Sequence, residues 1–255
     1  MPASRADSLI SVLRCLDLTS LEEDDTDERI AALCRRAVRP GDSLPHVAAV
    51  CVFPRFVPLV RERLAGTGVL TAAAAGAFPS GRAPVGERLA EVRAAVEAGA
   101  EEIDTVMDHA AFLSQEVQAV ADTLAATREV CRDGVILKVI LETGALRSPD
   151  AIRSAAELAI VAGADFVKSS TGKAGVGVTL EAARVMMEAV GGHRDRTGRR
   201  VGVKLAGGIR TAEDALRYVA LVEEILGEGW IAPETFRIGA SSLADDLVAE
   251  LRSRS

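Results

Sequence analysis

Short apolar runs alternate with longer amphipathic stretches along this chain. Several of the short runs are apolar at nearly every position, as in strands that are covered on both faces. Eight of them predict strands, over residues 14–18, 47–53, 69–77, 102–107, 135–142, 165–170, 201–206 and 235–240. The stretches between them have helical periodicity and predict helices over residues 84–98, 114–132, 148–161, 179–190 and 211–226.

Helix boundary residues support this alternation. Ser148 precedes Pro149, and Thr211 stands three residues before Asp214, which resembles a capping box. Glycines follow the ends of the predicted helices, as expected of C-terminal caps. They are Gly99, Gly134, Gly163, Gly191 and Gly227. The Gly- and Arg-rich segment 191–200 is therefore predicted to be a surface loop.

Eight strands alternating with helices in 255 residues predict an α/β fold, a (β/α)8 TIM barrel with a short N-terminal helical extension. We expect one catalytic barrel domain over residues 1–255, because no linker or change in composition divides the chain. A doubly wound open sheet is the alternative. The glycine-rich segment 175–179 supports it only weakly, because it follows Lys173 rather than a strand, and no Walker motif is present.

The charge balance and the scattered metal-binding residue types exclude several classes of protein. With 30 Lys and Arg against 37 Asp and Glu, the net charge is −7, which argues against a nucleic-acid partner. No apolar run approaches the roughly 18–20 residues of a membrane span, so we expect no membrane partner. The four cysteines form no CxxC pair and the three histidines lie far apart. We therefore expect a cytoplasmic protein with reduced cysteines, no metal and no cofactor.

Four charged residues interrupt strands that are otherwise apolar: Asp104, Lys138, Lys168 and Lys204. In a barrel they would come from four neighbouring strands and meet inside. They could be a buried ion-pair network that only fills the barrel. However, an ammonium neighbour and a dry environment both lower the pKa of a lysine from about 10.4. A lysine made neutral in this way is the nucleophile of Schiff-base chemistry.

Three donor-rich loops follow the last three predicted strands. They are residues 170–173, 206–210 and 239–242, and they combine glycines with hydroxyl groups and helix starts. Barrel enzymes often bind phosphate after strands seven and eight, where backbone amides point at the anion. The glycines could also serve only as turns. The pattern favours a phosphorylated substrate.

Several long motifs resemble deoxyribose-phosphate aldolases, a family of class I aldolases that need no metal. The similarity extends over nearly the whole chain and is most specific at residues 137–143, 162–172 and 204–211. It implies that Lys168 forms the Schiff base, that Lys204 lowers its pKa, and that Asp104 moves protons together with Lys204. The implied substrate-binding set includes Asp17 and Thr19 for the hydroxyls, Cys51 near the substrate, Lys138 in the charge network, and Thr171. The residues implied to hold the phosphate are Gly172, Lys173, Gly207, Gly208, Ser241 and Ser242.

The implied reaction is the reversible cleavage of 2-deoxy-D-ribose 5-phosphate to D-glyceraldehyde 3-phosphate and acetaldehyde, a step of deoxyribose phosphate catabolism. The expected partners are these small molecules and a second copy of the chain in a homodimer. Two alternatives remain open at this point. One is a Schiff-base lyase acting on a different aldehyde pair, and the other is a non-catalytic barrel that senses sugar phosphates.

Overall fold

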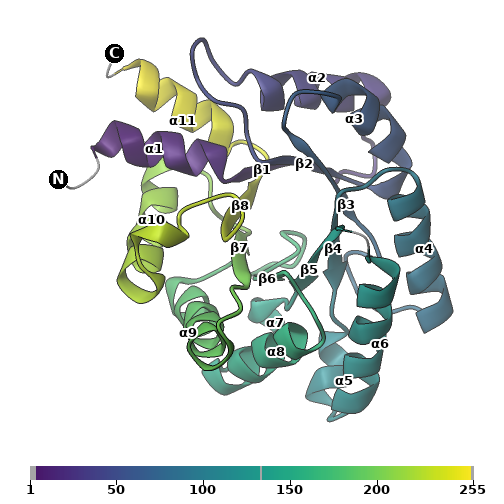
Figure 1. Ribbon diagram of the computed structural model, residues 1–255. Helices are drawn as coiled ribbons and strands as arrows, with labels where there is room; N and C mark the ends of the chain where they lie inside the picture. The colour runs from purple at the N-terminus through teal and green to yellow at the C-terminus, as the bar shows by residue number, and fades with distance from the viewer. Residues whose placement is uncertain (1–3, 133, 254–255) are drawn as a thin grey trace.

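The computed structural model describes residues 4–132 and 134–253. Eight parallel strands form a closed barrel in sequence order, with the last pairing back onto the first (Figure 1). The strands are β1 (Leu16–Thr19), β2 (Ala49–Val52), β3 (Leu70–Ala74), β4 (Glu102–Val106), β5 (Ile136–Ile140), β6 (Phe166–Lys168), β7 (Gly202–Ala206) and β8 (Phe236–Ala240). The barrel prediction is confirmed. The open-sheet alternative is wrong, because each of these strands has a neighbour on both sides.

Helices surround the barrel on its outside (Figure 1). They are α1 (Arg5–Arg14), α2 (Asp27–Val38), α3 (Val57–Leu64), α4 (Val85–Glu97), α5 (His109–Leu113), α6 (Val117–Val130), α7 (Thr143–Leu146), α8 (Pro149–Val161), α9 (Leu180–Thr197), α10 (Ala212–Leu226) and α11 (Leu243–Arg252), with the 3-10 turns η1 (Pro54–Phe56) and η2 (Glu228–Trp230). The helix α1 is the predicted extension and lies beside α11, where Arg5 Nε is 2.6 Å from Glu250 Oε1. None of these described helices is long and apolar enough to cross a membrane.

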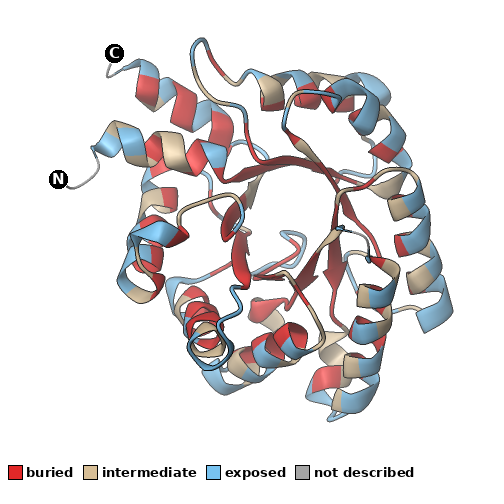
Figure 2. Cartoon of the chain, in the orientation of Figure 1, coloured by how far each residue is buried: buried red, intermediate tan, exposed pale blue. Residues whose placement is uncertain are grey.

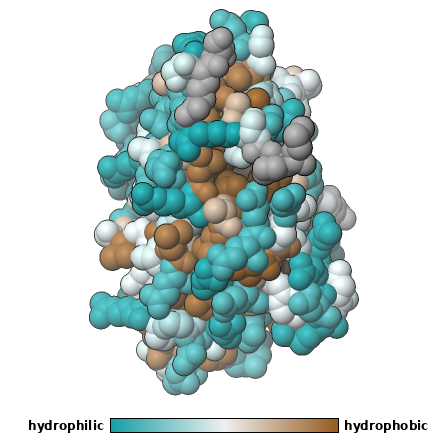
Figure 3. Space-filling view, turned by 90° about the vertical axis from the view of Figure 1, so that its left-hand side faces the viewer, coloured by the Kyte–Doolittle hydropathy of each residue, from teal (hydrophilic) through white to brown (hydrophobic). Residues whose placement is uncertain are grey.

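The main apolar core lies between the strands and the helices. Figure 2 shows the strands buried over most of their length and the helices buried mainly on the side that faces them. Strand residues such as Val139 and Leu205 pack there with helix residues such as Met186. Each such side chain contributes about 1.5–3 kcal/mol when fully buried. On the outer face that Figure 3 presents, polar side chains surround a smaller central group of apolar ones.

The inside of the barrel has a different composition. On β2 and β3, a second apolar cluster of small residues includes Ala49, Cys51, Ala72 and Ala74, all fully buried. Small side chains leave space within the barrel. Long charged side chains from the remaining strands fill that space, as described below.

The structure corrects two sequence predictions. The predicted strand 14–18 begins too early, because Arg14 is still the last residue of α1. The segment 191–200 is not a surface loop, because α9 continues to Thr197 and ends at Gly198, which adopts a φ of +75°. Gly191 is buried inside this helix, where an added Cβ would come within 3.2 Å of Leu226. A glycine that permits close packing was therefore misread as a helix end.

The predicted caps of α8 and α10 are confirmed. The side chain of Ser148 accepts a hydrogen bond from the backbone N–H of Ala151 at the start of α8. Thr211 and Asp214 form a complete capping box at the start of α10. Such caps satisfy backbone N–H groups that have no partner within the helix. They fix where α8 and α10 begin relative to the preceding strands.

Candidate active site

Two buried lysines share one carboxylate oxygen inside the barrel. The Nζ atom of Lys168 lies 2.8 Å from Asp104 Oδ2, and the Nζ atom of Lys204 lies 2.7 Å from the same oxygen. Lys168 and Lys204 are register partners on β6 and β7, so their side chains start side by side. Parallel pairing of neighbouring strands thus produces the predicted meeting of these three residues.

Asp17 and Lys138 continue this arrangement toward the amino-terminal ends of the strands. Asp17 Oδ2 lies 2.5 Å from Lys204 Nζ and 3.1 Å from Lys138 Nζ. Lys138 Nζ is also 3.1 Å from Asp104 Oδ1, and these two residues are register partners on β5 and β4. Asp17 is fully buried. The structure therefore places it within an ion-pair network.

Two further members of the network, Glu102 and Arg237, were not found from the sequence. Arg237 Nη2 lies 2.8 Å from Glu102 Oε1, and Arg237 Nη1 lies 2.5 Å from Asp17 Oδ1. Glu102 also pairs with Lys138. Strand periodicity could have found Glu102, because it stands two residues before Asp104 and shares its face. Arg237 is the register partner of Lys204, which only the closed barrel reveals.

These seven side chains form what we call the ionic cluster: Asp17, Glu102, Asp104, Lys138, Lys168, Lys204 and Arg237. Three are carboxylates, and three of the four basic groups suffice to balance them. All seven are buried. Because unbalanced charge is costly in a dry interior, one basic group is favoured to be neutral.

The direction of the pKa shifts shows which lysine of the cluster gives up its proton most readily. Burial lowers the pKa of Lys168 and Lys204 lowers it further, although Asp104 opposes both. Burial also acts to lower the pKa of Lys204, but Asp104 and Asp17 outweigh it and raise that pKa. The same holds for Lys138, whose pKa is raised by Asp104, Asp17 and Glu102 against the effect of burial. Of the three lysines, Lys168 is the one most easily deprotonated.

The acidic partner and the neighbouring thiol have opposite protonation states. Burial disfavours the charged form of Asp104, but Lys138, Lys168 and Lys204 outweigh it and hold its pKa well below the usual value. Asp104 is therefore a carboxylate at neutral pH. Burial raises the pKa of Cys51 to about 11, and its Sγ lies 3.8 Å from Asp104 Oδ2. Cys51 therefore remains a neutral thiol beside the charged groups.

A cavity of about 180 Å³ opens above the cluster, at the carboxyl-terminal ends of the strands. Lys168, which is 2% exposed, reaches this cavity. Other predicted site residues that line it are Thr19, Thr171, Gly172, Lys173, Gly207, Gly208, Ser241 and Ser242. Asp17, Cys51, Asp104, Lys138 and Lys204 do not line it. The structure thus separates the predicted residues into a binding wall and a buried layer beneath Lys168.

The two helices that start at this cavity differ in how their first N–H groups are used. The start of α10 is closed by its capping box and by Asp246, whose Oδ2 accepts a hydrogen bond from Ala212 N at 2.6 Å. Among the described residues, no side chain caps α11, which begins after Ser242. Free N–H groups at a helix start attract anions. The α11 end of the cavity is therefore the better place for a phosphate.

A basic side chain stands at the same cavity. Lys173 Nζ lies 2.9 Å from Glu22 Oε2, and both residues line the cavity wall. The Lys173 side chain is 32% exposed and that of Glu22 is 64% exposed. Because this pair is open to water, it is weak and can rearrange around an incoming anion.

A larger cavity, of about 670 Å³, lies at the opposite end of the barrel. Its wall includes Arg14, His46 and Arg237 but not Lys168. It therefore lacks the nucleophile, and the smaller cavity is the candidate active site.

Among the described residues, no three His, Cys, Asp or Glu side chains are grouped so that they could hold a metal ion.

Comparison with known proteins identifies the family. The sequence model of the DeoC/LacD family aldolases matches residues 11–245. The chain belongs to the DeoC/LacD aldolase family. The resemblance to deoxyribose-phosphate aldolases that the sequence motifs predicted is confirmed, and the enzyme is an aldolase.

Solved structures of other family members agree with this. A Coccidioides immitis protein, provisionally named a deoxyribose-phosphate aldolase, is 32% identical with a TM-score of 0.81, over 96% of this chain and 87% of that one. A deoxyribose phosphate aldolase from Aeropyrum pernix, described as tetrameric, is 27% identical with a TM-score of 0.75, over 99% and 94% of the two chains. A Toxoplasma gondii protein with the same provisional name, 24% identical with a TM-score of 0.86 over 98% and 94%, supports the fold.

Proposed function

We propose that this aldolase is a deoxyribose-phosphate aldolase whose single barrel domain carries all of the chemistry. It cleaves 2-deoxy-D-ribose 5-phosphate reversibly to D-glyceraldehyde 3-phosphate and acetaldehyde. The observation that carries the proposal is the shared oxygen of Asp104, which contacts both Lys168 and Lys204 beneath a cavity with anion-binding loops. The expected cytoplasmic location and homodimeric assembly belong to the same proposal.

Lys168 is the nucleophile in this mechanism. Its lowered pKa leaves a larger share of free amine at neutral pH than an exposed lysine has. The free amine attacks C1 of the open-chain sugar, and loss of water from the carbinolamine gives an iminium ion on Nζ. This new positive charge forms beside Asp104, whose carboxylate stabilises it.

Cleavage then uses the iminium ion as an electron sink. A base removes the proton of the C3 hydroxyl, the C2–C3 bond breaks, and its electron pair forms an enamine between C1 and C2. Glyceraldehyde 3-phosphate leaves. The enamine is protonated at C2, and water releases acetaldehyde and restores the Lys168 amine. We assign these proton transfers to Asp104 and Lys204, whose Oδ2 and Nζ atoms lie 2.7 Å apart.

The rim loops bind the remote end of the substrate. We assign the phosphate to the start of α11 together with Gly207, Gly208 and Lys173, because the uncapped helix and the lysine both favour an anion there. Thr19 lines the same cavity, and we assign it to a sugar hydroxyl. Binding energy gained at the phosphate holds the sugar in position for attack at C1.

Borohydride trapping tests this proposal. The protein is incubated with acetaldehyde, reduced with borohydride, digested and mapped by mass spectrometry. We expect an ethyl group on Lys168 and none on Lys138 or Lys204. A Lys168→Ala variant is expected to lose both the label and all cleavage activity. Labelling at a different lysine would contradict the assignment.

Product analysis separates the proposal from its two alternatives. With deoxyribose 5-phosphate as substrate, we expect acetaldehyde and glyceraldehyde 3-phosphate in equal amounts. A lyase with another aldehyde pair would be labelled at Lys168 but release different products. A sugar-phosphate sensor would bind the substrate without turnover.

A further inference from the structure

Residues 169–179, which we call the β6 loop, connect Lys168 at the end of β6 to α9. Part of this loop lines the active-site cavity, at Thr171, Gly172 and Lys173. Where these residues lie depends on how both ends of the loop are held. The first end is fixed by Glu142, whose buried Oε2 accepts hydrogen bonds from Thr171 Oγ1 at 2.6 Å and from Thr171 N at 3.2 Å.

The second end of the β6 loop packs against residues 207–211, which follow β7 and which we call the β7 loop. Val178 N donates a hydrogen bond of 3.1 Å to Gly207 O. The two backbones are in such close contact at Gly177 that an added Cβ there would come within 2.2 Å of Gly207 O. Gly207 itself has a φ of +87°, a conformation that favours glycine. The β6 loop thus lies directly on one of the loops that we assign to phosphate binding.

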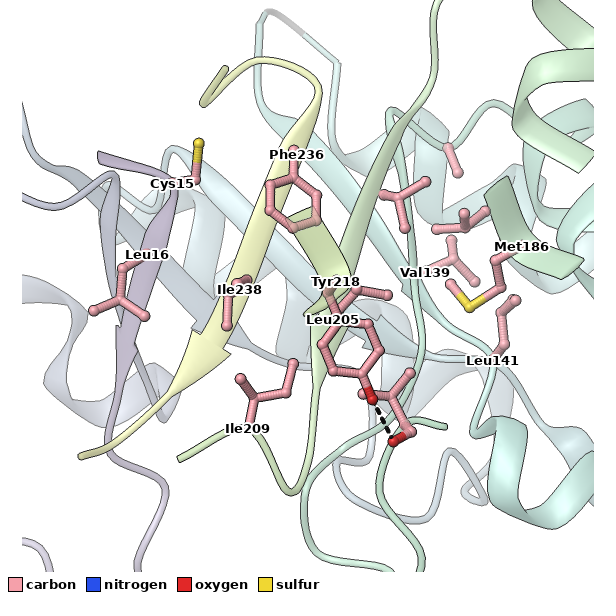
Figure 4. Close-up of a cluster of buried hydrophobic side chains, with 14 of the residues drawn as sticks. Cys15, Leu16, Val139, Leu141, Met186, Leu205, Ile209, Tyr218, Phe236 and Ile238 are labelled. Atoms are coloured by element: carbon pink, nitrogen blue, oxygen red, sulfur yellow. Dashed lines mark hydrogen bonds between the residues drawn. The ribbon is translucent and has the colours of Figure 1, made fainter. Parts of the chain in front are cut away.

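Tyr218 stabilises this contact between the two loops from outside the cavity. It lies on α10, is buried to 8% exposure, and its hydroxyl donates a hydrogen bond of 2.9 Å to Val178 O (Figure 4). Val178 is therefore held on both sides, through its N–H by Gly207 and through its carbonyl by Tyr218. Tyr218 does not line the cavity. Because the hydroxyl and the carbonyl are both buried, losing this bond leaves an unsatisfied group.

We propose that Tyr218 is a positioning residue for phosphate recognition: it fixes the β6 loop onto the β7 loop so that both present their donors to the same anion. This inference rests on the proposed function of the site. The role is specific to the phosphate end, because Lys168 and Asp104 are held by the strands and by the ionic cluster rather than by this loop.

Steady-state kinetics of Tyr218→Phe with two substrates test the role. Deoxyribose 5-phosphate carries the phosphate and 2-deoxyribose does not. We expect KM for the phosphorylated sugar to rise by about three- to tenfold with kcat unchanged, since one buried hydrogen bond is lost. We expect kcat/KM for 2-deoxyribose to stay at the wild-type value. Equal loss on both substrates, or no loss on either, overturns the inference.

A matched variant controls for the loss of a buried hydroxyl as such. Thr235 lies just before β8, and its Oγ1 donates a hydrogen bond of 2.8 Å to Trp230 O. Thr235→Val removes a similar hydroxyl-to-carbonyl bond away from the cavity, and we expect it to leave KM for both sugars unchanged. If Thr235→Val reproduces the phosphate-specific rise in KM, the effect is one of general stability and the inference is wrong.

Binding of inorganic phosphate separates failure of this inference from failure of the proposed function. Calorimetric titration of wild type and Tyr218→Phe with phosphate needs no turnover. We expect the variant to bind phosphate about three- to tenfold more weakly. Equal affinity overturns the inference while leaving the aldolase proposal intact. If the wild type cleaves no deoxyribose 5-phosphate but binds phosphate more tightly than the variant, the proposed function fails and the positioning role stands.

Discussion

Charged groups inside the barrel are shielded from water, whereas those at the carboxyl-terminal ends of the strands face it. Lys204 and Asp104 are fully buried and paired, while the Lys173 side chain is 32% exposed and pairs with an even more exposed Glu22. In the interior, charge pairs shift pKa values strongly because little water screens them. At the cavity mouth, the same kind of pair is weak and leaves its cation free for a ligand. The buried charges therefore control the reactivity of Lys168, whereas the exposed charges at the cavity mouth serve to capture the substrate.

Removing Lys204 should have the largest effect. Lys204→Leu takes away the cation that helps to lower the pKa of Lys168 and leaves Asp104 to raise it. We expect kcat at neutral pH to fall by about 10²–10⁴-fold. Because Lys168 must lose a proton to attack, the acid limb of the pH–rate profile moves to higher pH. Near-normal rates at pH 7 would show that Lys204 does not control the amine.

Removing Arg237 should test whether charge balance alone matters. Arg237→Met deletes one positive charge from the same cluster but leaves the contacts of Asp104 with Lys168 and Lys204 in place. We expect a loss of about 3–5 kcal/mol in the free energy of unfolding, measured by denaturant titration, because Glu102 and Asp17 lose a buried partner.

Its effect on kcat should be smaller than that of Lys204→Leu, because Arg237 touches none of the groups that transfer protons. If both variants lose the same fraction of kcat, the distinction between charge balance and proton transfer is wrong. The matched pair is informative because each variant removes one cation from the ionic cluster.

Removing Lys173 should have a modest effect confined to binding. Lys173→Ala takes away an exposed cation at the cavity wall, so we expect KM for deoxyribose 5-phosphate to rise by about two- to fivefold with kcat unchanged. High salt should reduce the difference between the variant and the wild type. A fall in kcat at saturating substrate would mean that Lys173 acts on the chemistry rather than on capture.

Removing the thiol of Cys51 should have the smallest effect. Its pKa of about 11 leaves it protonated at neutral pH, and its Sγ is 3.8 Å from Asp104. We expect Cys51→Ala to change kcat by less than about tenfold, and the borohydride label to remain on Lys168. A complete loss of activity in a folded variant would assign the thiol a chemical role.

The sequence predicted the barrel and the central charged residues because both follow from local pattern. A lysine in an apolar strand is conspicuous, so Lys138, Lys168 and Lys204 could be recognised as inward-facing residues. Glu102 and Arg237 escaped notice because each stands near a strand end, where a charged residue is ordinary. Their pairing depends on barrel closure, which brings β8 and β4 side chains together across the interior.

The position of Asp17 relative to the cavity also depends on packing rather than on pattern. Sequence resemblance associates Asp17 with the substrate, but its contacts with Lys138, Lys204 and Arg237 follow only from the depth at which it sits on β1. The end of α9 was missed for a similar reason. In the sequence, Gly191 resembles the residue that ends a helix. Only the structure shows that it lies inside α9, where the absence of a side chain permits close packing against Leu226.

The near balance between three carboxylates and four basic groups in the barrel interior constrains how this protein can vary. A single exchange that adds or deletes a charge there leaves a surplus that solvent screens poorly. Substitutions in related chains should therefore occur as compensating couples, an acid lost together with a base. The small alanines of β2 and β3 provide the space in which such a couple could be replaced by two apolar side chains.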